Sequence, residues 1–245
     1  MSMKNNIAVQ LYSLRDFIAD DVDGGLAKVA AMGYTGVELA GFYGLTGDEL
    51  AVLLNKHGLK VAGSHLGIEA LREDLDGVIA NHKAVGCTNI VVPYYTFDCV
   101  GCVTSLAKEM TAIAADLAEQ GMTLLYHNHD HEFKEIGGEY IMSILLREAP
   151  AIELELDTCW STVAGVDTVA YMNQYRDRLR LAHIKDCIPG EDGKVTLKSV
   201  GAGTLDIPAI LAAAADAEWL IVENDEPEGD AYEDVKRSIV YIKSV

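Results

Sequence analysis

The sequence is poor in basic residues and has no long apolar run. Of its 245 residues, 19 are Lys or Arg and 38 are Asp or Glu, which gives a net charge of −19. So acidic a surface repels phosphate backbones and anionic lipids, which argues against nucleic-acid and membrane binding. No apolar stretch approaches the roughly 20 residues that a membrane-spanning helix requires. The N-terminal segment lacks a signal-peptide core, so we expect a soluble cytoplasmic protein.

Cysteines are few, odd in number and scattered. The five are Cys87, Cys99, Cys102, Cys159 and Cys187, and such a set does not indicate a disulfide framework. Cys99 and Cys102 form a Cys-x-x-Cys motif, but no second Cys or His pair follows at the spacing of a zinc site. A thioredoxin-like motif would need a helix N-terminus within a βαβ unit. We favour a coincidence in a loop and keep the redox alternative open.

A repeated pattern runs through the chain. In each copy a helical stretch ends at a Gly, and an apolar run follows after two or three residues; the glycines are Gly33, Gly58, Gly86 and Gly121. Gly directly after a helix is typical of the left-handed C-cap. Nearly continuous apolar strands are typical of a parallel sheet that is covered on both faces. The pattern therefore predicts alternating helices and buried parallel strands.

The whole chain divides into eight such units. The expected strands are 7–11, 36–39, 60–63, 89–92, 123–126, 152–156, 181–184 and 219–222. The expected helices are 25–32, 48–57, 75–85, 105–120, 140–148, 168–178, 207–217 and 230–243, with Asp206 as an N-cap. This count predicts a single-domain (β/α)8 TIM barrel over residues 1–245. A doubly wound open sheet is disfavoured because no Gly-rich phosphate loop follows the first strand.

Polar side chains gather where the expected strands end. In a TIM barrel these ends converge on the face that carries the active site. The residues are Glu38, His65, Tyr94, Tyr95, His127, His129, Asp157, His183, Lys185, Glu223 and Asp225. Imidazoles and carboxylates without thiolates indicate a divalent cation such as Mn²⁺, Mg²⁺, Co²⁺ or Zn²⁺. His57 and His82 fall within helices instead, where we expect them to be solvated.

Three further features accompany these strand ends. Alternation puts Glu155 on the face of Asp157, where it should hydrogen-bond a metal ligand; an exposed carboxylate on a frayed strand is the alternative. The Gly-rich segment 187–206 is expected to be a lid or a mobile surface loop. Aromatic residues near the strand ends should stack on a sugar ring or pack at the rim; they are Tyr12, Phe42, Tyr43 and Trp160.

Six segments together carry a family resemblance; they are VQLYSLRD at 9–16, GVELA at 36–40, YHNHD at 126–130, LDTCW at 156–160, AHIKD at 182–186 and VE at 222–223. With them the chain resembles, over essentially its full length, the sugar phosphate isomerase/epimerase family of xylose isomerase-like TIM barrels. The resemblance implies a divalent metal, Mn²⁺ in the first place, held by Asp157, His183 and Glu223. Many relatives have a Glu at the end of strand 5, whereas this sequence resembles a Tyr-His-Asn-His subgroup. His127, or alternatively Glu132, is expected to supply the fourth ligand.

The resemblance also implies an activity. We expect isomerisation or epimerisation of a keto-sugar or polyol-derived ketone, by proton abstraction beside a carbonyl through a metal-stabilised enediolate. The expected catalytic residues are Glu223, His65, His129 and Lys185, and the expected substrate contacts are Gln10, Tyr12, Glu38 and Trp160. The same intermediate would serve a dehydratase or lyase acting on an inosose or a 3-keto-glycoside.

Two other functions remain as alternatives. A non-catalytic sugar-binding barrel is compatible with the departure at strand 5. An abasic-site endonuclease resembling endonuclease IV is disfavoured by the net charge of −19. The same acidity favours a neutral carbohydrate over a sugar phosphate as substrate, and a homo-oligomer is compatible with the sequence.

Overall fold

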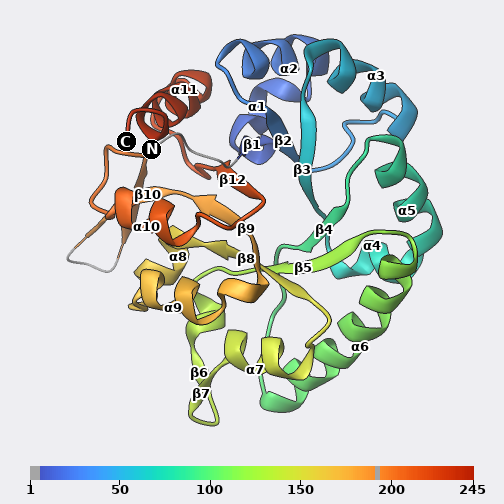
Figure 1. The fold of residues 1–245 in the computed structure, drawn as a ribbon, viewed down its shortest axis with the longest axis vertical. Helices are drawn as coiled ribbons and strands as arrows, with labels where there is room; N and C mark the ends of the chain where they lie inside the picture. Colours follow the sequence, from blue (N-terminus) through green and yellow to red (C-terminus); the bar gives the residue numbers. More distant parts are fainter. Residues whose placement is uncertain (1–5, 191–193) are drawn as a thin grey trace.

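Eight parallel strands form a closed barrel at the centre of the molecule (Figure 1). The computed structural model describes residues 6–190 and 194–245. The barrel strands are β1 (Asn6–Gln10), β2 (Gly36–Leu39), β3 (Lys60–His65), β4 (Asn89–Val92), β5 (Thr123–His127), β8 (Glu153–Asp157), β9 (Leu179–Ile184) and β12 (Trp219–Val222). They follow one another around the barrel in chain order, and β12 closes it by pairing with β1. The predicted single-domain TIM barrel is confirmed.

Helices surround the strands on all sides (Figure 1). They are α1 (Arg15–Ile18), α2 (Val22–Ala31), α3 (Gly47–His57), α4 (Ile68–Glu73), α5 (Leu75–Ala84), α6 (Val100–Glu119), α7 (Ile141–Glu148), α8 (Thr158–Val163), α9 (Thr168–Gln174), α10 (Ile207–Ala213) and α11 (Ala231–Ile242). Within the described residues, none of these helices combines the length and the apolar composition needed to cross a membrane.

The local signals in the sequence explain how these elements begin and end. All four repeat glycines, Gly33, Gly58, Gly86 and Gly121, have positive φ angles between 68° and 93°, which only Gly adopts without strain. Asp206 caps α10, as predicted, by accepting the N–H of Ala209 at 3.1 Å. The four glycines let the chain turn back toward the next strand after α2, α3, α5 and α6.

The structure also differs from the expected elements in several places. α6 begins five residues earlier than predicted, at Val100, and α10 ends earlier, at Ala213. Three short helices, α1, α4 and α8, and two hairpins were not predicted. The hairpins pair β6 (Glu135–Ile136) with β7 (Glu139–Tyr140), and β10 (Asp186–Pro189) with β11 (Val195–Lys198). Short elements such as these carry too few residues for a periodic pattern to reveal them.

The segment 187–206 is a hairpin followed by an anchored loop, apart from residues 191–193, which lie outside the described residues. The buried carboxylate of Asp186 accepts the backbone N–H groups of Gly201 and Gly203 at 2.9 Å and of Leu205 at 3.1 Å. These three hydrogen bonds hold the loop against the barrel. Residues 201–205 are therefore anchored to Asp186.

The barrel interior has an apolar half and a polar half. The apolar cluster consists of Ala8, Ala62, Val91, Leu125, Leu181, Trp219 and Ile221, all buried. Two residues further along the same strands, the side chains become polar, as at Gln10 on β1, His127 on β5 and His183 on β9. Since alternate residues share a strand face, these polar groups stand directly above the apolar cluster, at the carboxyl ends of the strands.

Candidate active site

Four buried side chains converge at the carboxyl end of the barrel. They are His127 on β5, Asp157 on β8, His183 on β9 and Glu223, which directly follows β12. One nitrogen or carboxylate oxygen of each lies within 4.8 Å of those of the other three. Two imidazoles and two carboxylates at this spacing are a suitable ligand set for a divalent cation. We call these four residues the upper cluster.

His127 has the protonation state that a metal ligand requires. Burial lowers the pKa of His127 to about 4, so its imidazole is neutral at pH 7. Its Nε2 atom lies 3.5 Å from Oδ2 of Asp157 and has no hydrogen-bond partner among the described residues. A buried nitrogen without a partner is costly, and a cation bound to its lone pair would remove that cost. The donor chemistry of His127 therefore fits a metal.

Asp157 is oriented by its immediate neighbours. Its Oδ1 accepts the N–H groups of Cys159 and Trp160 at 2.9 and 2.8 Å, so the residue caps α8. Its own N–H donates to Oδ1 of Asn128, which lies in the loop after β5, at 2.9 Å. These contacts leave Oδ2 directed toward His127 and Lys185. Asn128 of the Tyr-His-Asn-His segment thus holds a residue of the upper cluster.

Lys185 is buried among three carboxylates. Its Nζ lies 2.9 Å from Oδ2 of Asp157, 2.7 Å from Oε2 of Glu223 and 2.8 Å from Oδ2 of Asp225. Burial alone would lower the pKa of Lys185, but these carboxylates raise it well above the ordinary value. The ammonium group is therefore charged and neutralises part of the negative charge that the upper cluster carries.

A second group of polar side chains lies beneath the upper cluster and shares His183 with it. This lower cluster consists of Glu38, His65, Glu155 and His183. Nε2 of His183 contacts Oε2 of Glu38 at 2.6 Å, while its Nδ1 contacts Oε2 of Glu223 at 2.8 Å. His65 Nε2 contacts Oε2 of Glu155 at 2.6 Å. His183 therefore has one ring nitrogen facing each cluster.

The lower cluster contains two fully buried carboxylates. Burial and the charge of Glu155 raise the pKa of Glu38 to about 7. Burial also opposes ionisation of Glu155, but His183 and His65 hold its pKa well below the ordinary value. Gln10 donates to Oε2 of Glu38 at 2.9 Å. As predicted, Glu155 is buried below Asp157, and its hydrogen bond goes to His65, with His183 at 3.3 Å.

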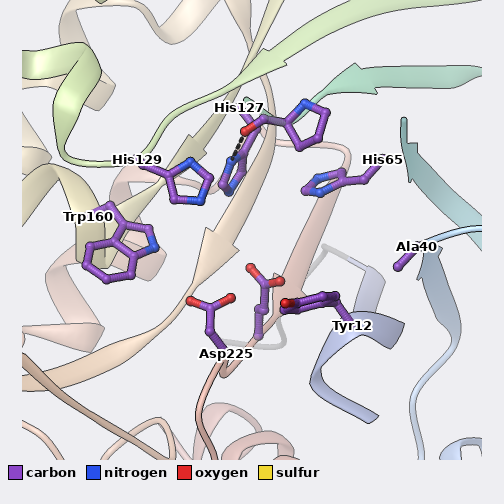
Figure 2. Close-up of a pocket in the computed structure, with 9 residues that line it drawn as sticks. Tyr12, Ala40, His65, His127, His129, Trp160 and Asp225 are labelled. Carbon is purple, nitrogen blue, oxygen red and sulfur yellow. Dashed lines mark hydrogen bonds between the residues drawn. The ribbon is translucent and has the colours of Figure 1, made fainter. Parts of the chain in front are cut away.

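A pocket of about 410 Å³ opens above the upper cluster (Figure 2). The described residues that line it are Tyr12, Ala40, His65, Pro93, His127, His129, Trp160, Glu223 and Asp225. Figure 2 shows the three imidazoles facing into this space, with Trp160 and Tyr12 on opposite sides and Asp225 between them. The volume lies within the range of pockets that bind small molecules.

The comparison with family models agrees with this architecture. A model described as xylose isomerase-like TIM barrel matches residues 26–244. The chain belongs to the xylose isomerase-like TIM barrel family.

Similar proteins within and around this family carry several activities in their names. A curated inosose dehydratase from Geobacillus kaustophilus is 23% identical over 186 residues, which cover 66% of this chain and 60% of that protein. A sugar phosphate isomerase/epimerase from Parabacteroides distasonis has a TM-score of 0.85 at 23% identity, with 98% of both chains covered. The IolI protein, whose structure holds a zinc atom, has a TM-score of 0.74 at 16% identity, with 98% of both chains covered.

Most of the candidate site residues predicted from the sequence lie at or beside the pocket. His65, His127, His129 and Glu223 line it, as do Tyr12 and Trp160. Asp157, His183 and Lys185 are buried beside Glu223. Gln10 and Glu38, which we expected to contact substrate, are fully buried and are not among the lining residues. Phe42 lies against His82 instead of the pocket.

Glu132, the alternative ligand from the sequence, is occupied elsewhere. Its Oε1 accepts the hydroxyl of Tyr126 at 2.8 Å and lies 3.0 Å from Nε2 of His131. Its Oε2 accepts the backbone N–H of His129 at 2.8 Å. It is absent from both groups of ligand-type residues found among the described residues, whereas His127 belongs to the upper cluster. The geometry therefore favours His127 over Glu132.

His82 does not have the solvated environment that its helix position predicted. It is 3% exposed, with Nδ1 at 2.6 Å from the carbonyl of Val78 and Nε2 at 2.9 Å from Oγ of Ser64 on β3. The expectation was wrong because α5 packs this side chain against the outer face of the barrel. His57 is partly buried, and its Nε2 lies 2.7 Å from Asp23.

Three residues to which the sequence assigned no specific role acquire one in the structure. Asp225 contacts Lys185 and lines the pocket, Asp186 holds the loop at residues 201–205, and Asn128 holds Asp157. Asp225 could be found from the sequence, because residues two apart on a strand share a face and Glu223 is two residues earlier. The roles of Asp186 and Asn128 depend on hydrogen bonds to segments that local patterns do not bring together.

Proposed function

We propose that this protein is a divalent-metal-dependent isomerase or epimerase of a keto-sugar or a polyol-derived ketone. The observation that carries the proposal is the upper cluster, four buried ligand-type residues. Two of them, His127 and Glu223, line a pocket together with two further imidazoles, His65 and His129. Acyclic and cyclic hydroxy-ketones lose a proton beside the carbonyl only when the resulting enediolate is stabilised. The combination of a cation site and proton-carrying side chains meets that requirement.

The cation would be held by His127, Asp157, His183 and Glu223, and it would supply electrostatic stabilisation of negative charge on the substrate's carbonyl and hydroxyl oxygens. Manganese is the metal that we favour, with Mg²⁺, Co²⁺ and Zn²⁺ as alternatives. His183 would then keep a proton on Nε2, which donates to Glu38 at 2.6 Å. A carboxylate in that position fixes the tautomer and the ring orientation of a metal-binding imidazole.

The remaining groups would move protons and bind hydroxyl groups. Glu223 and His129 approach the pocket from different strands, so one can remove the proton beside the carbonyl and the other can return it. Burial lowers the pKa of His129, which keeps its imidazole neutral and able to accept a proton at pH 7. Lys185 does not line the pocket and is paired with three carboxylates, so it would act on charge that develops on the substrate only at a distance, by offsetting the negative charge of Asp157 and Glu223.

We further propose a neutral carbohydrate as the substrate. The nine described residues that line the pocket include no Lys or Arg, and two of them, Glu223 and Asp225, are acidic. A phosphate group would meet these carboxylates without a cationic side chain to bind it. Trp160 and Tyr12 on opposite sides of the pocket suit the apolar faces of a sugar or cyclitol ring (Figure 2).

Dehydration is the second candidate function. It is favoured by the similarity to an inosose dehydratase over 66% of this chain. The same enediolate would lose a hydroxyl group from the neighbouring carbon if an acid protonated that hydroxyl. His65 suits this role because, although burial opposes its charge, Glu38 and Glu155 raise its pKa. An inosose or a 3-keto-glycoside would be the substrate.

The decisive experiment is solvent deuterium exchange. The protein, supplied with Mn²⁺, Mg²⁺, Co²⁺ or Zn²⁺ in separate samples, is incubated in D₂O with keto-sugars, ketoinositols and keto-glycosides, and the products are followed by NMR and mass spectrometry. Deuterium at the carbon beside the carbonyl without loss of water supports isomerisation or epimerisation. An unsaturated product supports the dehydratase or lyase.

Two variants provide the controls for this experiment. Glu223→Gln removes one of the two carboxylates of the upper cluster, and we expect it to lower the exchange rate by at least about 100-fold. Glu119→Gln removes an exposed carboxylate at the last residue of α6 and should leave the rate unchanged. If the purified protein bound no divalent ion and exchanged no substrate in the panel, the enzyme proposal would fail and a non-catalytic barrel would replace it.

A further inference from the structure

The Cys-x-x-Cys motif lies at the start of α6, in the βαβ unit formed by β4, α6 and β5. Cys99 is the N-cap residue of this 20-residue helix, and its Sγ accepts the backbone N–H of Cys102 at 3.2 Å. The expectation that the motif lies in a loop is therefore wrong. A helix N-terminus in a βαβ unit is the setting that a redox-active Cys-x-x-Cys requires.

The two sulfur atoms are already in contact. Sγ of Cys99 and Sγ of Cys102 lie 2.7 Å apart. A disulfide bond has a sulfur–sulfur distance of about 2.05 Å, so the two sulfurs must approach each other by less than about 1 Å to form one. Cys99 precedes the first helical residue, Val100, so this approach can be made at the N-cap position.

The environments of the two thiols differ in the way that exchange chemistry needs. Cys99 is exposed, whereas Cys102 is half-buried. Hydrogen bonds from the thiol and the backbone N–H of Cys102 lower the pKa of Cys99, and the neighbouring Asp98 opposes this with a smaller effect. Donation of that thiol hydrogen bond raises the pKa of Cys102. Cys99 thus combines thiolate character with access to solvent.

We propose that Cys99 and Cys102 are a reversible redox dithiol that exchanges with small-molecule disulfides. The thiolate of Cys99 attacks one sulfur of the disulfide, the sulfur–sulfur bond breaks, and one small thiolate leaves. Cys102 then loses its proton and attacks Sγ of Cys99, which releases the second small thiolate. The two cysteines lose two electrons, the small disulfide gains them, and the two protons end on the two released thiols.

Equilibration with glutathione tests this chemistry directly. The full-length protein is incubated with mixtures of oxidised and reduced glutathione, quenched with acid and alkylated, and its peptides are mapped by mass spectrometry. We expect Cys99 and Cys102 to become oxidised together, as one intramolecular disulfide whose fraction follows the glutathione ratio. Cys87 is buried and serves as the unreactive internal reference.

Single variants assign the two roles. Cys102→Ser should trap one glutathione on Cys99, because no second thiol displaces it. Cys99→Ser should leave Cys102 at least about tenfold slower to react than Cys99. Serine is a favoured N-cap residue, so this variant retains the cap of α6, and circular dichroism checks that it folds.

Two results would overturn the proposal. One is a wild-type protein that keeps glutathione on Cys99 without closing the disulfide, or that does not react at all. The other is equal reactivity of the single remaining cysteine in the two variants. Neither measurement depends on a catalytic activity of the barrel, so the outcome is independent of the proposed function.

Discussion

The two halves of the barrel interior use the same strands and the same strand faces, but they have opposite chemistry. An apolar residue precedes a polar one by two positions in each of three pairs: Leu125 and His127 on β5, Leu181 and His183 on β9, and Ile221 and Glu223 at β12. The apolar half removes side-chain area from water and so stabilises the fold. The polar half buries charged side chains, and removing each of them from water costs free energy. Contacts between opposite charges offset part of that cost.

This contrast separates stability from function along a single strand. A residue change in the apolar half should act on folding and leave the chemistry of the site intact. A change in the polar half should act on ligand binding, because these side chains would hold the cation and its surroundings. Four measurements test this separation.

The largest effect is expected for Asp157→Asn. The amide keeps an oxygen to cap α8 but removes the charge of a carboxylate in the upper cluster, so the affinity for a divalent cation should fall by about 10³-fold, or about 4 kcal/mol. Isothermal titration calorimetry measures it. Asp230→Asn is the matched control, because Asp230 caps α11 through its Oδ1 in the same way, outside the cluster. Equal affinities in both variants would refute the assignment.

A somewhat smaller effect is expected for Leu181→Ala in the apolar half. Loss of this fully buried side chain leaves a cavity and should lower the free energy of unfolding by about 2–5 kcal/mol. Urea unfolding measures the change, and Val240→Ala, at a position that is 62% exposed, should change it by less than about 0.5 kcal/mol. The cation affinity of the folded variant should equal that of the wild type. A large loss of affinity would break the comparison.

Glu155→Gln should have an intermediate effect on the affinity of the upper cluster for a divalent cation. Glu155 contacts His65 at 2.6 Å and His183 at 3.3 Å, and loss of such an outer contact typically lowers metal affinity by about 10–100-fold. Glu153→Gln removes a carboxylate two residues earlier on the same strand, 34% exposed and paired with Arg180, and should change the affinity very little. If both variants behaved alike, the lower cluster would not support His183.

The smallest effect is expected on the pH dependence of stability, and it comes from His82, a buried imidazole outside the polar half of the interior. Burial lowers the pKa of His82 below the ordinary value of 6.5, so the unfolded chain binds the proton first as the pH falls. The stability that His82 contributes is present above about pH 6.5 and is lost as the pH drops below that value. Unfolding at several pH values should show a weaker decline below pH 6.5 in His82→Gln. An unchanged pH dependence would contradict this.

The sequence predicted the fold closely because its signals are local. Gly33, Gly58, Gly86 and Gly121 end helices through their own backbone conformation, and apolar runs form the strands wherever the chain is then directed. Closure of eight such strands brings their carboxyl ends together, so His65, His129, Asp157 and Glu223 could be assigned to one site before any contact was known.

Other features depended on contacts that no local pattern contains. Glu38 and His183 are 145 residues apart in the chain, yet their 2.6 Å contact decides that Glu38 lies behind the site instead of in the pocket. The choice of His127 over Glu132 depends on the hydrogen bonds that Tyr126, His129 and His131 make to Glu132. The same applies to the burial of His82 against Ser64.

The sequence by itself therefore determined the barrel, the order of its strands and the face on which polar residues meet, because helix caps, strand alternation and apolar runs act over a few residues. Only the tertiary structure decided that His127 rather than Glu132 completes the upper cluster, which residues support that cluster, and that the Cys99–Cys102 motif stands at the start of a helix. The physical reason is that the burial and the partners of a side chain depend on contacts between segments that are far apart in the sequence. Those contacts form only when the chain folds.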